Sequence, residues 1–196
     1  MKAAAGSFLL GAATVAGLAL LAVLLRPKRA ADITTTREPT PSVSAAPPDS
    51  DATALVIPVQ GFTRDRLRDT YSHARGLGRR HDAIDIEAPR GTPVLSVAAS
   101  VVVKLFQSDR GGTTLYALAP DQRTIYYYAH LDRYADGVTE GRRLRAGQII
   151  GYVGDTGNAR PGDYHLHFEI STTADPKKYW GGTPVNPYPL LRRDTL

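Results

Sequence analysis

The amino-acid sequence predicts an all-β domain over residues 54–196 of a 196-residue chain. From Leu55 onward, short runs rich in β-branched and aromatic residues alternate with turns rich in glycine, proline, aspartate and asparagine. Several short strands at such spacings are typical of an antiparallel sandwich or barrel. Helix signals are weak, and only residues 63–69 are expected to form a helical turn or two. The expected strands are residues 83–86, 94–98, 101–106, 113–118, 124–131, 149–153 and 165–171.

The composition excludes several kinds of site. The sequence contains no cysteine, so disulfides, thiolate metal ligands and a cysteine nucleophile are excluded. Any metal ion must therefore be held by histidine, aspartate or glutamate. The net charge of +5 is spread along the chain without a dense basic block. Such a mild excess suits an anionic polymer, either nucleic acid or cell wall, but it equally suits ordinary solubility.

The N-terminal segment is expected to be a membrane anchor. Residues 3–25 form a run of 23 residues without a charge, and about 20 apolar residues are enough to cross a bilayer. A cleaved signal peptide would have a shorter apolar region and an A-x-A-like site. Here the run is followed by Arg26-Pro27-Lys28-Arg29 instead. We therefore expect residues 1–25 to form an uncleaved transmembrane helix rather than a cleaved signal segment.

Residues 26–53 are expected to be a disordered linker. They contain five prolines, a run of three threonines, and no aromatic residue. Such a segment buries too little apolar surface to offset the entropy lost on ordering. Fully extended, it would reach roughly 90 Å at about 3.3 Å per residue. The folded domain is accordingly assigned to residues 54–196.

The candidate chemistry centres on the histidines. His81 and Asp85 are four residues apart at the start of an expected strand, where the two-residue period places both on one face. A neutral imidazole and a carboxylate are both good zinc ligands, although this pair alone is a weak signal. The chain has five histidines: His73, His81, His130, His165 and His167.

A second pattern lies in the last expected strand. His165 and His167 alternate with Leu166, Phe168 and Ile170. The apolar residues are expected to face the core, which leaves the two imidazoles on the opposite face, about 7 Å apart along the strand. The two histidines could serve one site, or they could simply be surface residues of a half-exposed strand.

A third pattern surrounds His130. If alternation is strict, Tyr126, Tyr128 and His130 share one face. Tyr126 and Tyr127 are expected to pack across strands, which is the usual role of aromatic residues in sheets. Tyr128 is the candidate substrate-binding residue, because it could line a cleft beside His130. His73 stands apart in a polar run and is interpreted as a loop histidine.

Together these motifs resemble the lysostaphin-type (M23, LytM-like) zinc metallopeptidases. The order is His-x-x-x-Asp, then His, then His-x-His, and the flanking sequences agree from about residue 56 to residue 190. The resemblance implies an antiparallel β-sheet domain with an open groove. By position, the zinc ligands would be His81, Asp85 and His167, and the catalytic residues would be His130 and His165. Which of these two is the general base is left open.

The resemblance also implies a function. It indicates a Zn²⁺-dependent endopeptidase that hydrolyses peptide cross-bridges of bacterial peptidoglycan. Peptidoglycan is the expected partner, along with the membrane through the N-terminal helix, and no nucleic-acid partner is expected. One alternative is a non-catalytic wall-binding or amidase-activating module of the same fold. Another is a lipoyl- or biotinyl-like carrier domain, which would need a modifiable lysine at an exposed turn.

Two arguments about orientation disagree. One lysine, Lys2, precedes the apolar run, whereas Arg26, Lys28 and Arg29 follow it. The positive-inside rule would therefore place the folded domain in the cytoplasm. A peptidoglycan substrate would place it outside. We expect a single-pass protein of the cytoplasmic (inner) membrane whose peptidase domain faces the periplasm or cell wall.

Overall fold

The computed structural model describes residues 54–193, which contain nearly all of the expected β domain. The expected anchor, residues 1–25, and the expected linker, residues 26–53, lie outside the described residues, and both stay predictions. Within residues 54–193, no helix is both long enough and apolar enough to cross a membrane.

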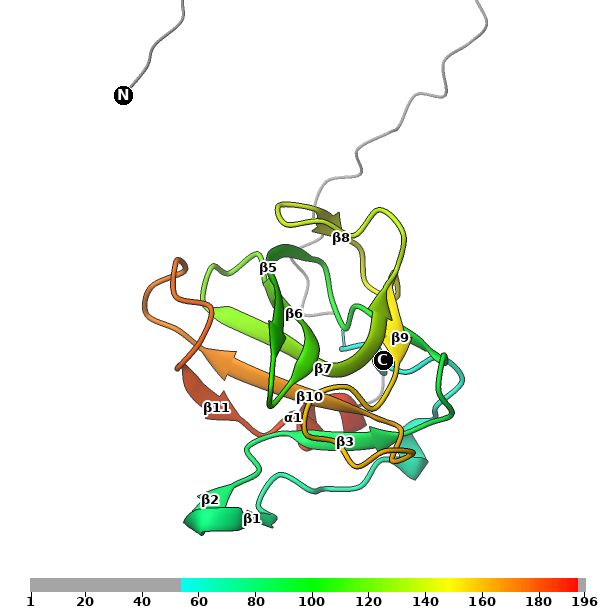
Figure 1. Ribbon diagram of the computed structural model, residues 1–196. Helices are drawn as coiled ribbons and strands as arrows, with labels where there is room; N and C mark the ends of the chain where they lie inside the picture. Colours follow the sequence, from blue (N-terminus) through cyan, green and yellow to red (C-terminus); the bar gives the residue numbers. More distant parts are fainter. Residues whose placement is uncertain (1–53, 194–196) are drawn as a thin grey trace, which may run out of the picture. The chain divides into compact units, whose positions relative to one another are not determined.

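Nine strands of the described region form one curled antiparallel sheet (Figure 1). The main path runs β11-β10-β7-β6-β5-β8, while β3 pairs with β10 and β9 pairs with both β4 and β7. Their bounds are β3 (Ile84–Glu87), β4 (Pro93–Leu95), β5 (Ser100–Ser108), β6 (Gly112–Leu118), β7 (Thr124–Tyr134), β8 (Arg143–Leu144), β9 (Ile149–Val153), β10 (His165–Thr172) and β11 (Thr183–Val185). Each expected strand overlaps an observed one, so the all-β prediction is confirmed.

Smaller elements surround this sheet. A separate hairpin pairs β1 (Ala74–Arg75) with β2 (Arg79–Arg80) through a 3-10 turn, η2 (Gly76–Gly78), and lies below β3 in Figure 1. The expected helical turns at residues 63–69 shrink to the 3-10 turn η1 (Arg64–Arg66). The helix α1 (Pro187–Arg192) begins after Asn186, whose side chain accepts a hydrogen bond from the Tyr188 N–H at 2.9 Å. Proline at the first helical position suits this start because it lacks an N–H.

The two faces of the sheet differ in chemistry. Along β3 and β10, Ile84, Ile86, Leu166 and Phe168 are at most 1% exposed and belong to the hydrophobic core. The residues between them point to the opposite face, because successive side chains of a strand alternate. That opposite face therefore carries Asp85 and Glu87 from β3 and His165 and His167 from β10.

Strand β7 departs from this regular alternation. His130 has a φ of +59°, a conformation that is uncommon for residues other than glycine. The pairing of β7 also shifts register against β6 and against β9 close to this residue. The backbone therefore turns between Tyr128 and His130. Tyr128 points into the core, whereas His130 reaches the face that carries the other histidines.

Two tight loops support the β7 irregularity. The His130 N–H donates to the Gly111 carbonyl at 2.8 Å, and the Asn158 N–H donates to the Arg110 carbonyl at 3.0 Å. The loop after β5 and the loop after β9 thus meet beside His130. A Cβ atom at Gly157 would overlap the backbone of Gly112 and Arg110, so this approach requires glycine.

We expect Gly157→Ala to destabilise the fold by about 1–3 kcal/mol more than Gly137→Ala, because only the first change overpacks a contact. Both glycines have a positive φ, +76° and +75°, so the strain from adding a Cβ is shared. No atom lies within 4 Å of a Cβ built at Gly137. Urea unfolding of the two variants gives their free energies of unfolding, which can be compared if the two m-values are equal. Equal losses in the two variants would contradict a tight contact between the loops.

Candidate metal centre and active site

Three potential metal ligands converge from two neighbouring strands. His81 Nε2, Asp85 Oδ1 and His167 Nδ1 lie 3.0 Å from one another and form an equilateral triangle. The antiparallel register places Asp85 of β3 directly opposite His167 of β10. His81 precedes β3 and is buried, with 8% of its surface exposed. Among the described residues, these three form a group that could hold a metal ion.

The donor set and its spacing fit a zinc ion. Imidazole nitrogen and carboxylate oxygen bind zinc at about 2.0–2.2 Å, so ligand atoms of a tetrahedral site lie roughly 3.3–3.5 Å apart. The observed edges of 3.0 Å would open only slightly to reach that spacing. Three protein ligands also leave one tetrahedral position open, which is the arrangement of catalytic rather than structural zinc sites.

The electrostatics of the triad favour the metal-binding protonation states. Burial alone would raise the pKa of Asp85, but hydrogen bonds to His167 and His81 hold that pKa well below its usual range. Burial lowers the pKa of His167 and outweighs the opposing effect of Asp85. At neutral pH, Asp85 is therefore an anion and His167 is neutral. These are the forms in which the two side chains bind a metal.

Thr70 holds two of the three ligands in place. Its backbone carbonyl accepts a hydrogen bond from His81 Nδ1 at 2.9 Å, which fixes the tautomer and leaves Nε2 free to face the triad. Its hydroxyl accepts a hydrogen bond from the Asp85 N–H at 3.0 Å. On the other side, Arg75 donates to Asp85 Oδ2 at 2.5 Å, so that Oδ1 is left for the triad.

His130 and His165 lie beside the triad as a second pair. Their ring centroids are 4.8 Å apart, and the His130 ring is 5.7 Å from that of His167. His165 Nε2 is 3.9 Å from Asp85 Oδ1. The structure therefore brings all five of the residues predicted as metal ligands or catalytic groups into one place.

The second pair shares one tautomer. His130 Nδ1 donates to the Thr156 carbonyl at 2.7 Å, and His165 Nδ1 donates to the Asp163 carbonyl at 2.8 Å. Because a carbonyl only accepts, the proton of a neutral ring is held on Nδ1, and its Nε2 atom is then available as a proton acceptor. Burial lowers the pKa of His130 to about 4, so its imidazole is neutral at pH 7.

The prediction that Tyr128 binds substrate is wrong. Tyr128 is fully buried, its hydroxyl accepts a hydrogen bond from the Val97 N–H at 3.0 Å, and its ring packs 5.2 Å from that of Phe168. The turn at His130 explains the error, because it breaks the alternation that linked the two residues. Tyr127 instead presents its ring edge-on to His167, with 6.1 Å between the centroids.

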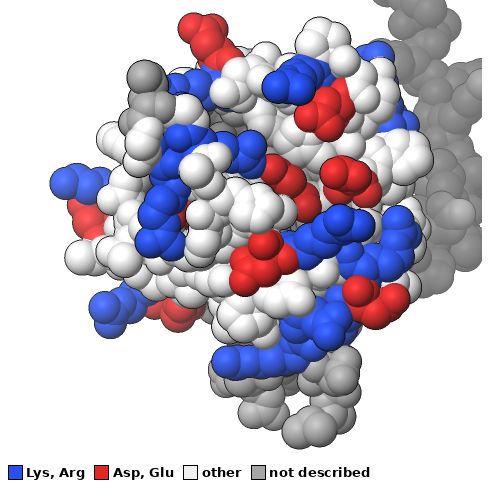
Figure 2. Space-filling view, turned by 90° about the horizontal axis from the view of Figure 1, so that it is seen from below, with Lys and Arg blue, Asp and Glu red and all other residues white. Residues whose placement is uncertain are grey.

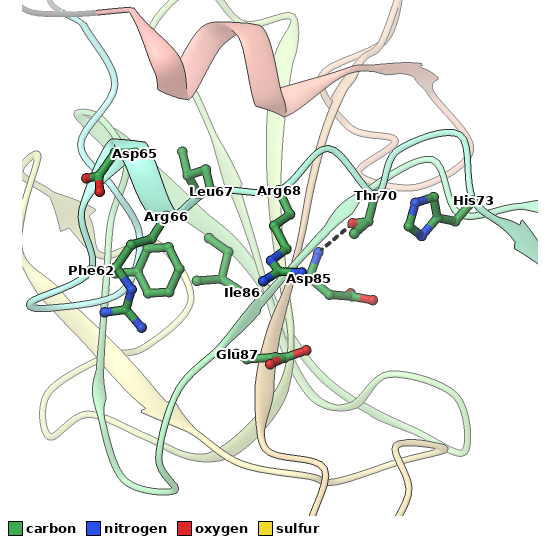
Figure 3. Close-up of a pocket in the computed structure, with 10 residues that line it drawn as sticks. All are labelled: Phe62, Asp65, Arg66, Leu67, Arg68, Thr70, His73, Asp85, Ile86 and Glu87. Carbon is green, nitrogen blue, oxygen red and sulfur yellow. Dashed lines mark hydrogen bonds between the residues drawn. The ribbon is translucent and has the colours of Figure 1, made fainter.

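A cleft of about 610 Å³ opens beside Asp85 (Figure 3). One wall is the irregular segment from Phe62 to His73, and the other is β3. His73, which was expected to be a loop histidine apart from the site, lines the same cleft as Asp85. The lining residues are Phe62, Asp65, Arg66, Leu67, Arg68, Thr70, His73, Asp85, Ile86 and Glu87. Figure 2, which views the molecule from below Figure 1, shows basic and acidic side chains interspersed on that face.

Comparison with known proteins places these features in a family. Residues 79–187 match peptidase family M23. The chain is 34% identical over 146 residues to the L-Ala–D-Glu endopeptidase of Bacillus subtilis (strain 168), which covers 71% of this chain and 43% of that protein. It is 30% identical over 116 residues to the glycyl-glycine endopeptidase ALE-1 of Staphylococcus capitis, covering 59% and 30%. The chain thus spans less than half the length of each of these relatives.

A solved structure supports the same assignment. The catalytic domain of the antimicrobial peptidase lysostaphin from Staphylococcus simulans aligns with a TM-score of 0.57 at 27% sequence identity. The alignment covers 66% of this chain and 96% of that domain.

We expect Thr70→Val to weaken zinc binding by about 10–100-fold, as is usual when a partner of a metal ligand is removed. The change keeps the shape of the side chain but removes the hydroxyl that accepts from the Asp85 N–H. Thr70→Ser keeps that hydroxyl and serves as the matched control. Competition with a chromophoric zinc chelator measures both affinities. Equal affinities for the Val and Ser proteins would contradict a positioning role for the hydroxyl.

Proposed function

The chain belongs to peptidase family M23, and on that premise we propose that it is a zinc-dependent endopeptidase that hydrolyses peptide bonds of bacterial peptidoglycan. The observation that carries the proposal is the triad of His81, Asp85 and His167 with a second pair of histidines beside it. The names of two relatives, an L-Ala–D-Glu endopeptidase and a glycyl-glycine endopeptidase, add support. The two names specify different peptide bonds. The peptide cross-bridge of peptidoglycan is therefore one candidate substrate of this chain, and another peptide bond of the wall is a second.

In the proposed mechanism, His81, Asp85 and His167 are the zinc ligands. Zinc held there would polarise the scissile carbonyl and lower the pKa of a water molecule towards about 7. The protein supplies the orientation of the ligands through Thr70 and Arg75. The protein also buries His81, His130 and His165 almost completely. In such a surrounding, charges of the site and the substrate would interact more strongly than in water.

The proposal gives His130 and His165 the proton transfers. In its neutral form, each ring would present an unprotonated Nε2, since its Nδ1 is hydrogen-bonded to a backbone carbonyl. Such a nitrogen can accept the proton that the attacking water loses. The resulting imidazolium can stabilise the oxyanion and then return a proton to the leaving amine. The two rings carry the same tautomer, so the proposal assigns these steps to the pair.

We further propose that residues 1–25 anchor the chain in the cytoplasmic membrane and that the domain faces the cell wall. The length of the uncharged run supports the anchor, and the proposed substrate supports the orientation. Membrane fractionation with alkaline extraction tests the anchor. Protease treatment of spheroplasts tests the orientation. A domain released by alkali would contradict the first part, and a domain protected from protease would contradict the second.

Substitutions in the two groups of histidines should have different effects. We expect His167→Ala to lose both zinc and cleavage. We expect His165→Ala to retain zinc but to lose cleavage by about 10²–10⁴-fold, the usual contribution of a proton-transfer group. Elemental analysis gives zinc per chain, and mass spectrometry of digested peptidoglycan gives the bond that is cut.

Two outcomes would contradict the assignment. Normal turnover by the His165→Ala protein would remove that residue from the mechanism. Zinc binding by the unaltered protein without any cleavage of peptidoglycan would favour the non-catalytic wall-binding module instead.

A further inference from the structure

Among the described residues, no strand pairs with the outer edge of β3, which lies beside the candidate metal centre. The Ala88 N–H donates to the Tyr164 carbonyl of the segment before β10, and the His165 N–H donates away from β3 to the Gly154 carbonyl. The Asp85 N–H donates to Thr70. Antiparallel pairs alternate between hydrogen-bonded and non-hydrogen-bonded. Ile84 and Ile86 therefore bond to β10, whereas the main-chain groups of Asp85 and Glu87 point away from it.

This edge offers several main-chain groups to a partner. Within residues 54–193, the Asp85 carbonyl and both the N–H and the carbonyl of Glu87 have no hydrogen-bond partner beyond the sheet. The Asp85 N–H of this edge donates to the Thr70 hydroxyl. A free strand edge is a template on which an extended peptide can add as a further strand.

The cleft lies along this edge and reaches the metal centre. Asp85, Ile86 and Glu87 form one wall of its 610 Å³, and the segment that contains Thr70 forms the other (Figure 3). This volume falls within the range of about 300–1,000 Å³ that is usual for ligand sites. Because Asp85 is also a member of the triad, a peptide paired with β3 would have its backbone beside the proposed zinc site.

The charges of the lining indicate what kind of peptide fits. Arg68 is exposed, and it forms no ion pair or hydrogen bond with another described residue. Figure 3 shows its side chain reaching from the upper wall towards β3. The planar guanidinium matches a carboxylate. Arg66 also lines the cleft, with its guanidinium 4.4 Å from the Phe62 ring centroid, and Asp65, Asp85 and Glu87 contribute three carboxylates. Two guanidinium groups and three carboxylates leave no excess of positive charge that would attract a polyanion. The contact that we infer is therefore a single one, between Arg68 and one carboxylate.

We propose that the substrate pairs as an extended strand with the outer edge of β3 and that Arg68 binds a free carboxylate close to the scissile bond. This inference rests on the proposed function and narrows its substrate class. A stem peptide with a glutamate residue carries such a carboxylate, whereas a bridge made of glycine carries none within its chain. The cleft therefore selects acidic stem-peptide bonds over neutral glycine bridges.

The carboxylate contact can be tested with two synthetic stem peptides. They differ only in whether the glutamate has a free carboxylate or the corresponding amide. For the unaltered full-length protein, we expect amidation to raise KM by roughly ten-fold or more, as expected for loss of a charged hydrogen bond. For Arg68→Gln, KM for the acid peptide should rise by a similar factor, and amidation should have no further effect. Arg145→Gln, an exposed arginine outside the cleft, is the matched control.

The main-chain contact has its own test. Glu87→Pro removes an N–H that points away from the sheet, where proline is tolerated on an edge strand. Compared with Glu87→Ala, it should raise KM for both peptides by roughly 2–10-fold, the effect of one hydrogen bond. The melting temperature of each variant shows whether the fold is intact. If Glu87→Pro does not fold, an ester replacing each amide of the peptide in turn removes the N–H from the substrate side.

The outcomes separate this inference from the function on which it rests. If the unaltered protein cuts neither peptidoglycan nor any peptide, the proposed function fails. If it cuts peptidoglycan and a pentaglycine peptide but not the acid stem peptide, the function stands and the inference is overturned. An equal effect of amidation in the unaltered and Arg68→Gln proteins would also overturn it.

Discussion

The cross-strand pairing of β3 with β10 is the constraint on which the candidate site depends. The register sets Asp85 opposite His167, and it sets Ile84 and Ile86 opposite apolar residues of β10. A slip of one residue would turn the two ligands into the core and expose their apolar neighbours. Burial stabilises each large apolar side chain by about 1.5–3 kcal/mol, so the core strongly opposes such a slip. The packing of one face therefore fixes the ligand geometry on the other.

Backbone carbonyls impose a second constraint, because they fix the histidine tautomers. The carbonyls of Thr70, Thr156 and Asp163 accept hydrogen bonds from the Nδ1 atoms of His81, His130 and His165. Each of these rings therefore presents Nε2. His167 differs, since its Nδ1 faces the triad. All three carbonyls belong to irregular segments, so the strands position the rings while the loops determine which ring nitrogen faces the site.

The sequence alone could predict the regular part of this arrangement. Alternation correctly placed His165 and His167 on the face opposite Leu166 and Phe168, because β10 is regular where it pairs with β3. The grouping of Asp85 with His167 came instead from the resemblance to a known family. It failed on β7, since a non-glycine residue with a positive φ has no signal in an alternation pattern. Thr70 and Arg75 were also missed as partners of the ligands. Their contacts cross 15 and 10 residues of mostly irregular chain, where no residue spacing indicates which groups will meet.

In the proposed function, the outer edge of β3 would connect metal binding with substrate binding. Exposed edge strands are a liability, because they can pair with other chains. Here the segment that contains Thr70 lies opposite the edge of β3, so the edge lines a cleft rather than an open surface. Thr70 contacts both His81 and Asp85, so it is at once part of the cleft wall and a support of the triad. In the proposed binding mode, a peptide enters between β3 and this wall. Any displacement of the wall would then move His81 and Asp85 together, so the fit of the peptide and the geometry of the proposed metal site would change together.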